Sequence, residues 1–132
     1  KRTGGHVRAM IARSGAPNAF LNYKMKEYFP KFNLALLEIG LLSGKTHQIR
    51  AQAAFRGHSV AGDRIYGNFT INKELREALG LRRLFLHAWS LILPHPASGK
   101  MLEITSPLPE DLEDFLFKCN AQRTMKNEKR GR

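Results

Sequence analysis

Apolar and polar side chains follow different patterns along this chain, and each pattern predicts an element. From Ala19 to Glu27 the pattern is short and mixed, which is typical of an exposed strand. From Leu34 to Leu42 nearly every residue is apolar, so we expect a strand that is buried on both faces and central in a sheet. Residues 84–93 alternate, and a turn with proline and glycine at 94–100 leads to residues 101–105, which predicts a hairpin.

Two short helices are predicted in the middle of the chain. The first runs from about His47 to Arg56, with Thr46 as its cap and Gly57 placed to end it in a left-handed conformation. The second runs from Asn72, which would serve as its cap, to Leu79, and Gly80 follows it. Both would flank the predicted sheet.

A third helix is predicted to begin at Pro109. Glu110 and Asp111 lie in its first turn, where negative charge complements the helix dipole. One stripe of this helix is apolar and would pack on the sheet: Leu112, Phe115, Leu116 and Cys119. Together the elements predict one domain of the α+β class, with a mixed, largely antiparallel sheet and short flanking helices.

The charge of the chain changes this picture by pointing to a partner. Lys and Arg total 22 against 11 for Asp and Glu, which gives a formal net charge of +11. This excess predicts an acidic partner, with nucleic acid as the first candidate and a membrane surface as the second. No apolar run approaches the roughly 18 residues of a membrane span, and no leader indicates secretion, so we expect a soluble, cytoplasmic protein.

The two ends of the chain are expected to differ from its centre. Residues 1–18 predict a basic lead-in or connector, and residues 120–132 predict a solvated basic tail around the folded part at 19–119. Residue 1 is Lys rather than Met, so we expect that part of the natural protein precedes it. A mitochondrial transit peptide would also lie there, so a mitochondrial location stays open.

The segment from Gly44 to Gly67 concentrates glycines, cations and hydrogen-bond donors, which is typical of a site that faces a polyanion. Its Gly44-Lys45-Thr46 suggests a nucleotide-binding loop, but that motif requires a glycine where this chain has Ile39. The histidines do not have the spacing of zinc ligands. They are His6, His47, His58, His87 and His95. We therefore expect neither nucleotide hydrolysis nor a metal site.

Arg50 is the residue whose chemistry its position constrains most. On the predicted helix it lies beside Ile49 and Ala53, where a guanidinium needs a carboxylate or phosphate partner if it is buried. A structural ion pair with Glu38 or with Asp63 is one interpretation of this residue.

Three other residues have structural interpretations. Asp63 follows Gly62 and is expected to be a turn residue that bonds its own backbone, rather than a nucleophile. Trp89 is expected to lie in the core rather than to stack on RNA bases. Cys119 is the single cysteine, so it has no disulfide partner in the chain, and we expect a core thiol.

One series of motifs runs through the chain. It consists of Gly44-Lys45-Thr46-His47-Gln48-Ile49-Arg50, Gly57-His58, Gly62-Asp63, Tyr66-Gly67, Arg83-Leu84-Phe85-Leu86-His87-Ala88 and His95-Pro96 with Gly99. The series resembles the C-terminal half of an RluA-type pseudouridine synthase. The resemblance covers roughly residues 19–119, and residues 75–88 are most similar to the branch of the C-type ribosomal large-subunit enzymes. It implies the distal half of the pseudouridine synthase fold.

The resemblance also implies an activity. Such enzymes are isomerases that cleave a uridine base from its ribose in RNA, turn the base and rejoin it through carbon, and no cofactor or metal is implied. The family uses an aspartate in a His-Arg-Leu-Asp segment, a tyrosine shortly after it, and an arginine that pairs with the aspartate. Arg50 matches that arginine. The chain has no His-Arg-Leu-Asp, so we expect that segment before Lys1 and expect this chain alone to be inactive.

Ribosomal RNA is then the expected partner, and we expect a monomer. The candidate RNA contacts are Lys45, Thr46, His47, Arg56 and His58. Lys45 stands where the family usually has arginine, which keeps the charge but loses a bidentate fork. The alternative is a non-catalytic RNA-binding or ribosome-associated module derived from the same fold. A scaffold for acidic proteins ranks last, because it explains the charge but not the motifs.

Overall fold

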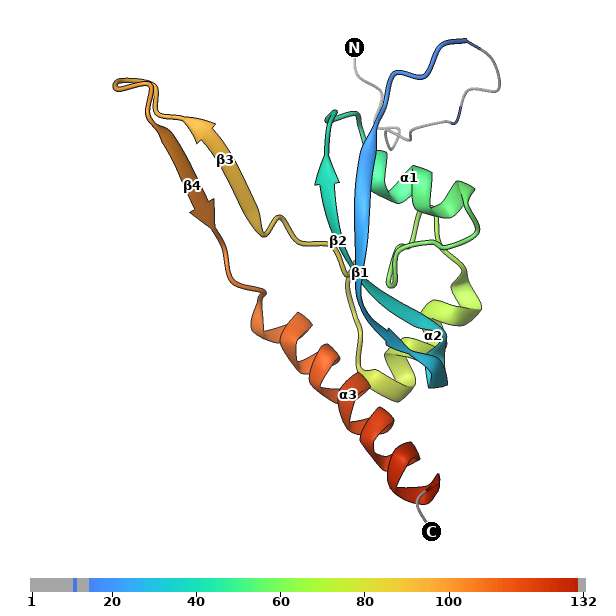
Figure 1. Cartoon of the computed structure of the whole chain (residues 1–132). Coiled ribbons are helices and arrows are strands. Elements are labelled where there is room, and N and C mark those ends of the chain that lie inside the picture. Colours follow the sequence, from blue (N-terminus) through green and yellow to red (C-terminus); the bar gives the residue numbers. More distant parts are fainter. Residues whose placement is uncertain (1–10, 12–14, 131–132) are drawn as a thin grey trace.

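The structure, a computed structural model, describes residue 11 and residues 15–130, with side chains as far as Gln122. Figure 1 shows how the elements are arranged. In chain order they are β1 (Leu21–Phe29), the 3-10 turn η1 (Pro30–Phe32), β2 (Leu34–Leu41), α1 (Gln48–Phe55), α2 (Phe69–Leu79), β3 (Ser90–Pro94), β4 (Met101–Thr105) and α3 (Glu110–Arg130). This content confirms the predicted α+β class.

The described strands pair into two antiparallel hairpins. β1 pairs with β2, and Phe29 faces Leu34 beside the turn. Asn33 closes that turn with a φ of 51°, a left-handed value that asparagine adopts more readily than most residues. β3 pairs with β4, and Pro94 faces Met101 beside the second turn. The predicted second hairpin is therefore confirmed, and Figure 1 shows that it extends away from the first.

The expected mixed sheet is wrong for the part of the chain that the structure describes. The hairpins form two separate two-stranded sheets, and β2 pairs only with β1 within residues 15–130. β2 is neither central nor covered on both faces, because Leu37 and Leu41 are exposed while Leu34 and Leu36 are partly buried. An apolar run reports how much apolar surface a strand carries, whereas its neighbours decide how much of that surface is covered.

The core lies where α2 and α3 meet the end of β1. Its buried members are Phe29, Leu75, Leu79, Leu81, Leu112, Phe115 and Cys119. Three members of the apolar stripe predicted for the third helix are among them, which confirms that helix and its buried face. Cys119 is the expected core thiol, and burial raises the pKa of its thiol to about 11. The thiol is therefore protonated and unreactive at neutral pH.

The helix ends differ from the predicted ends in two places. Thr46 does not cap α1, because His47 occupies the capping position with a left-handed φ of 50°. α2 begins at Phe69, about one turn before the predicted start, and Asn68 is its cap, since the Asn68 side chain accepts a hydrogen bond from the amide of Ile71. Gly57 is left-handed, as predicted.

The sequence also makes predictions for the segment before β3 and for the two chain ends. Residues 84–89 are irregular rather than a strand, and Phe85 packs against the core while its amide donates to the carbonyl of Ala61. Trp89 is 52% exposed, so the prediction of a core tryptophan is wrong. Residues 120–130, expected as a tail, continue α3. Most of the predicted lead-in at 1–18 lies outside the described residues.

Candidate active site around Arg50

One buried side chain holds the start of α1 beside Phe20, the residue that precedes β1. Gln48 is only 5% exposed, and its amide nitrogen donates to the carbonyl of Phe20 at 3.0 Å. Its side-chain oxygen accepts hydrogen bonds from the Ser43 hydroxyl at 2.9 Å and from the backbone amide of Lys45 at 3.1 Å. These bonds fix the loop between β2 and α1, and they therefore fix where the helix that carries Arg50 begins.

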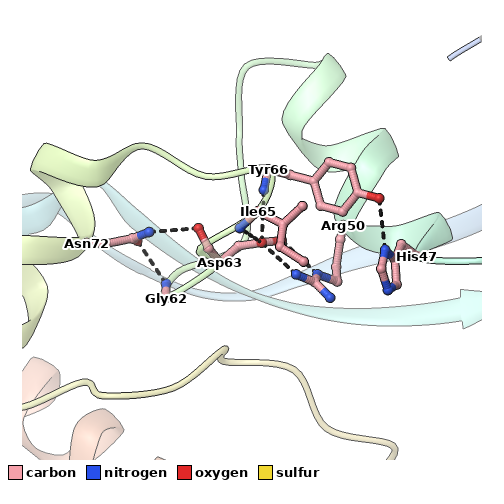
Figure 2. Close-up of polar contacts among 7 residues, drawn as sticks. All are labelled: His47, Arg50, Gly62, Asp63, Ile65, Tyr66 and Asn72. Atoms are coloured by element: carbon pink, nitrogen blue, oxygen red, sulfur yellow. Dashed lines mark hydrogen bonds and ion pairs between the residues drawn. The ribbon is translucent and has the colours of Figure 1, made fainter. Parts of the chain in front are cut away.

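Arg50 forms a bidentate ion pair with Asp63. Its Nε donates to Oδ2 at 2.9 Å, and its Nη2 donates to Oδ1 at 2.8 Å (Figure 2). The Asp63 side chain is fully buried, and the Arg50 side chain is 16% exposed. This confirms one of the two structural pairings considered for Arg50. Glu38, the other candidate, instead lies 3.5 Å from Lys26 on the exposed face of the first hairpin.

Asp63 is held by the turn in which it lies. Its Oδ1 also accepts the backbone amides of Ile65 at 3.0 Å and Tyr66 at 3.1 Å, so it bonds its own backbone as predicted. Its carbonyl accepts the side-chain amide of Asn72 at 2.8 Å. The Asn72 oxygen in turn accepts the amide of Gly62 at 3.0 Å, and this bond ties the turn to α2.

Glycine is required at position 62 for two reasons. Its φ is +79°, which side-chain-bearing residues rarely adopt. A Cβ added there would also collide with the carbonyl oxygen of Arg83, which belongs to the segment beside the turn. Gly62 therefore lets the turn approach the 82–85 segment closely enough to present Asp63 to Arg50.

Tyr66 and His47 complete the cluster. The Arg50 guanidinium carbon lies 5.3 Å from the centroid of the Tyr66 ring, within the range of a cation–π contact. A hydrogen bond of 2.8 Å joins His47 Nδ1 to the Tyr66 hydroxyl (Figure 2), and the two rings meet edge to face at 82°. One guanidinium is thus bounded by a carboxylate at one edge and by an aromatic ring.

The electrostatics of the pair follow from these contacts. Burial by itself would raise the pKa of Asp63, but hydrogen bonds from Arg50 and from the amides of Tyr66 and Ile65 outweigh it and hold that pKa below its usual value. The hydrogen bond to Asp63 raises the pKa of Arg50 above its usual value. Asp63 is therefore ionised at neutral pH and balances the charge of Arg50.

The predicted RNA contacts lie at both ends of α1. Lys45 and Thr46 are exposed just before the helix, and Arg56 and His58 are exposed just after it. His47 is partly buried, and one of its ring nitrogens is engaged by Tyr66. The five residues therefore do not form one cluster. Their contacts with RNA stay predictions.

Sequence reasoning missed the roles of Gln48, Tyr66 and Asn72 in this site. Gln48 and Tyr66 belong to the motifs that carry the resemblance, so the motifs themselves were the available signal. Asn72 had a competing explanation as a helix cap, which concealed its contact with the turn at Asp63.

The described residues contain neither a candidate metal site nor a helix that could span a membrane. No group of three or more His, Cys, Asp and Glu side chains within them is placed to hold a metal ion. None of the described helices combines the length and the apolar character that crossing a membrane requires.

Known proteins with sequences similar to this chain are pseudouridine synthases. No family model matches the chain. It is 34% identical to ribosomal large subunit pseudouridine synthase C of Haemophilus ducreyi over 113 residues, which are 86% of this chain and 34% of that protein. It is 39% identical to ribosomal large subunit pseudouridine synthase D of Nitrosomonas europaea over 111 residues, which are 83% of this chain and 31% of that protein. This chain is a homologue of the RluA-type pseudouridine synthases.

A third relative is a protein of Escherichia coli. The chain is 34% identical to ribosomal large subunit pseudouridine synthase C of Escherichia coli over 114 residues, which are 86% of this chain and 35% of that protein. The chain spans about a third of the length of the curated relatives it matches. RluA-type synthases of both the C and the D kind are thus relatives of this chain.

Proposed function

We propose that this chain is part of an RNA pseudouridine synthase that acts on large-subunit ribosomal RNA. In that reaction the bond between the ribose and N1 of a uridine breaks, the base turns, and the ribose is joined to C5; the hydrogen at C5 leaves to solvent, and N1 takes up a proton. The names of relatives that match more than four-fifths of the chain support both the reaction and the RNA substrate. The pseudouridine synthase fold is part of the same proposal.

The observation that carries the proposal is the state of the Arg50 guanidinium. Its Nε and Nη2 are held by Asp63, whereas its Nη1 makes no hydrogen bond to any residue that the structure describes. Arginine has five N–H donors in a rigid fork, so the remaining ones are available to a second acceptor. We assign this second acceptor to the aspartate of the His-Arg-Leu-Asp segment that the family uses.

Asp63 changes what Arg50 would do to that aspartate. A hydrogen bond from Nη1 favours the ionised carboxylate and lowers its pKa. Because Asp63 already balances the positive charge of Arg50, the long-range attraction is smaller than an unpaired arginine would supply. Arg50 would therefore act mainly by orienting the second carboxylate, and less by stabilising its charge.

The RNA contacts belong to the exposed ends of α1. Lys45, Thr46, Arg56 and His58 are proposed to contact phosphates, which are read mainly by cations and hydrogen-bond donors. The Nδ1 of His47 is bonded to Tyr66, which leaves only its Nε2 for a phosphate.

The test is an assay of the full-length protein on a large-subunit ribosomal RNA transcript that carries tritium at C5 of uridine. Formation of pseudouridine releases one tritium for each uridine converted, so release without added cofactor or metal is the expected result. A parallel measurement of RNA binding gives the second readout. RNA binding with no tritium release would contradict the enzyme and favour the non-catalytic RNA-binding module instead.

A further inference from the structure

Two side chains, the Asp63 carboxylate and the Tyr66 ring, define the position of the Arg50 guanidinium. The carboxylate of Asp63 fixes the Nε–Nη2 edge through two hydrogen bonds of 2.9 and 2.8 Å. That pair alone leaves the guanidinium able to swing about the line of the carboxylate. The ring of Tyr66, 5.3 Å away, occupies space beside the guanidinium and restricts that swing.

Asp63 and Tyr66 are presented by the same turn. The amide of Tyr66 donates to Asp63 Oδ1 at 3.1 Å, and the amide of Gly67 donates to the Asp63 carbonyl at 3.1 Å. The spacing between the carboxylate and the aromatic ring is therefore set by backbone hydrogen bonds within the turn. Any shift of Tyr66 changes the surroundings of Arg50 directly.

The hydroxyl of Tyr66 is tied back to the helix that carries Arg50. It is joined to His47 Nδ1 at 2.8 Å, and His47 is the residue directly before α1, three positions ahead of Arg50. His47 reaches this position with a left-handed φ of 50°, which non-glycine residues rarely adopt. Figure 2 shows the series of hydrogen bonds that join Arg50 to Asp63, Asp63 to the amide of Tyr66, and the Tyr66 hydroxyl to His47.

We propose that Tyr66, tethered by His47, is a positioning residue that holds the Arg50 guanidinium in the orientation needed for turnover. The proposal rests on the proposed function for its reaction. It also gives His47 a role other than phosphate contact, because the imidazole orients the tyrosine ring and the ring orients the arginine. Neither Tyr66 nor His47 needs to touch the uridine for this role.

The test compares conservative variants of the full-length protein. Tyr66→Phe removes the hydroxyl and keeps the ring, whereas His47→Asn removes the imidazole and keeps a residue that tolerates left-handed backbone. Each is expected to lower kcat about tenfold while KM for RNA stays within about twofold, since misplacement affects the chemical step more than binding. Tyr66→Leu, which removes the ring, should lower kcat further. Tyr23→Phe, at an exposed tyrosine of β1, is the matched control.

A double variant separates positioning from independent effects. Tyr66→Phe and His47→Asn remove the same hydrogen bond, so the double variant should be no slower than either single variant. Additive losses, or a kcat within about twofold of wild type for Tyr66→Phe, would overturn the proposal. A raised KM for His47→Asn alone, with Tyr66→Phe normal, would instead make His47 an RNA contact and overturn it too.

A measurement that does not depend on enzyme activity separates the positioning of Arg50 from the proposed function. The Arg50 Nε–H should give a slowly exchanging proton signal by NMR in the wild-type protein, and Tyr66→Leu should speed its exchange. If the wild-type protein makes no pseudouridine but the signal behaves this way, the proposed function fails and the positioning of Arg50 stands. An exchange rate that Tyr66→Leu leaves unchanged would overturn the positioning, whatever the activity.

Discussion

At the scale of single residues, the stability of the site depends on a buried ion pair. Removing one member of such a pair is costly, because the other charge stays buried without compensation. Asp63 also accepts two backbone amides, so its loss would leave those donors unpaired as well. The exposed pair of Lys26 and Glu38 has neither property, since both side chains are nearly half exposed.

Asp63→Asn in the full-length protein is therefore expected to lower the free energy of unfolding by about 3–5 kcal/mol. Glu38→Gln is the matched control, and it should lower that free energy by no more than about 1 kcal/mol. Urea denaturation measures both. Equal costs for the two variants would show that the buried pair contributes no more than the exposed one.

The pH dependence of stability has a definite sign. The pKa of Asp63 lies below its unfolded value of 3.8, so folding favours the ionised form. The contribution of Asp63 is fully present above that unfolded pKa and is lost as the pH falls through the lower pKa of the folded state. The difference in unfolding free energy between wild type and Asp63→Asn should shrink below pH 3.8. A difference that stays constant down to acid unfolding would contradict this assignment.

The sequence alone identified Arg50 but could not choose its partner. Glu38 and Asp63 were both acceptable, because each is a carboxylate within reach of a short helix. The choice depends on contacts between distant segments: Gly62 must approach Arg83, and Asn72 must hold the turn. No local pattern reports either contact.

At the scale of elements, α2 is capped by Asn68 and not by Asn72, the predicted cap. Asn72 looked like the cap, yet Asn68 caps the helix and Asn72 lies within its first turns. Capping depends on side-chain type and local spacing, and both asparagines satisfy it. Both polar atoms of the Asn72 side chain bond the turn, because its oxygen accepts the Gly62 amide and its nitrogen donates to the Asp63 carbonyl. Asn72 is thus engaged by a turn distant in sequence, while the side chain of Asn68 caps the helix.

The different contacts of Asn68 and Asn72 predict different results when each is replaced by alanine. Asn68→Ala removes a cap and should lower the free energy of unfolding by about 1 kcal/mol, with kcat unchanged. Asn72→Ala leaves the Gly62 amide without its partner and removes one of the two donors to the Asp63 carbonyl, so it should cost about 1–3 kcal/mol. Only Asn72→Ala should also lower kcat, because it loosens the turn that holds Arg50. A fall in kcat for Asn68→Ala alone would contradict the assignment.

Sequence periodicity identified most elements but misjudged how they are covered. The alternation of apolar and polar residues located β3 correctly. The segment before β3 has the same alternation but is irregular, and its Phe85 packs on the core without a strand partner. Trp89 then lies before a two-stranded sheet and stays half exposed. The sequence pattern indicates which side chains are apolar, but the packing of neighbouring elements determines which of them become buried.

At the scale of the whole molecule, the chain has a formal net charge of +11, and the cations that the structure describes lie both beside α1 and far from it. Only cations that contact phosphate release counterions, so the salt dependence of RNA binding counts the contacts that matter. Lys45 precedes α1, whereas Lys100 lies at the turn between β3 and β4, which Figure 1 shows far from α1.

Lys45→Gln is therefore expected to reduce the slope of log affinity against log salt by about 0.7–0.9. Lys100→Gln should leave that slope unchanged. Binding of the full-length protein to the same RNA, titrated at several salt concentrations, measures both. Equal slopes for wild type and Lys45→Gln would remove Lys45 from the RNA contacts.

In the proposed function, Arg50 serves the chemistry of a pseudouridine synthase and not the fold alone. The most direct measurement is single-turnover pseudouridine formation by Arg50→Lys in the full-length protein, alongside RNA affinity. Lysine keeps the charge opposite Asp63 but has no second edge to orient another carboxylate. Arg76→Lys, at an exposed position of α2, is the matched control.

The expected result is a loss of turnover of about a hundredfold or more for Arg50→Lys, with RNA affinity within about threefold of wild type. Arg76→Lys should behave as wild type. If Arg50→Lys folds, binds RNA and converts uridine at a rate near that of wild type, Arg50 is only a structural partner of Asp63, and the proposed site is wrong.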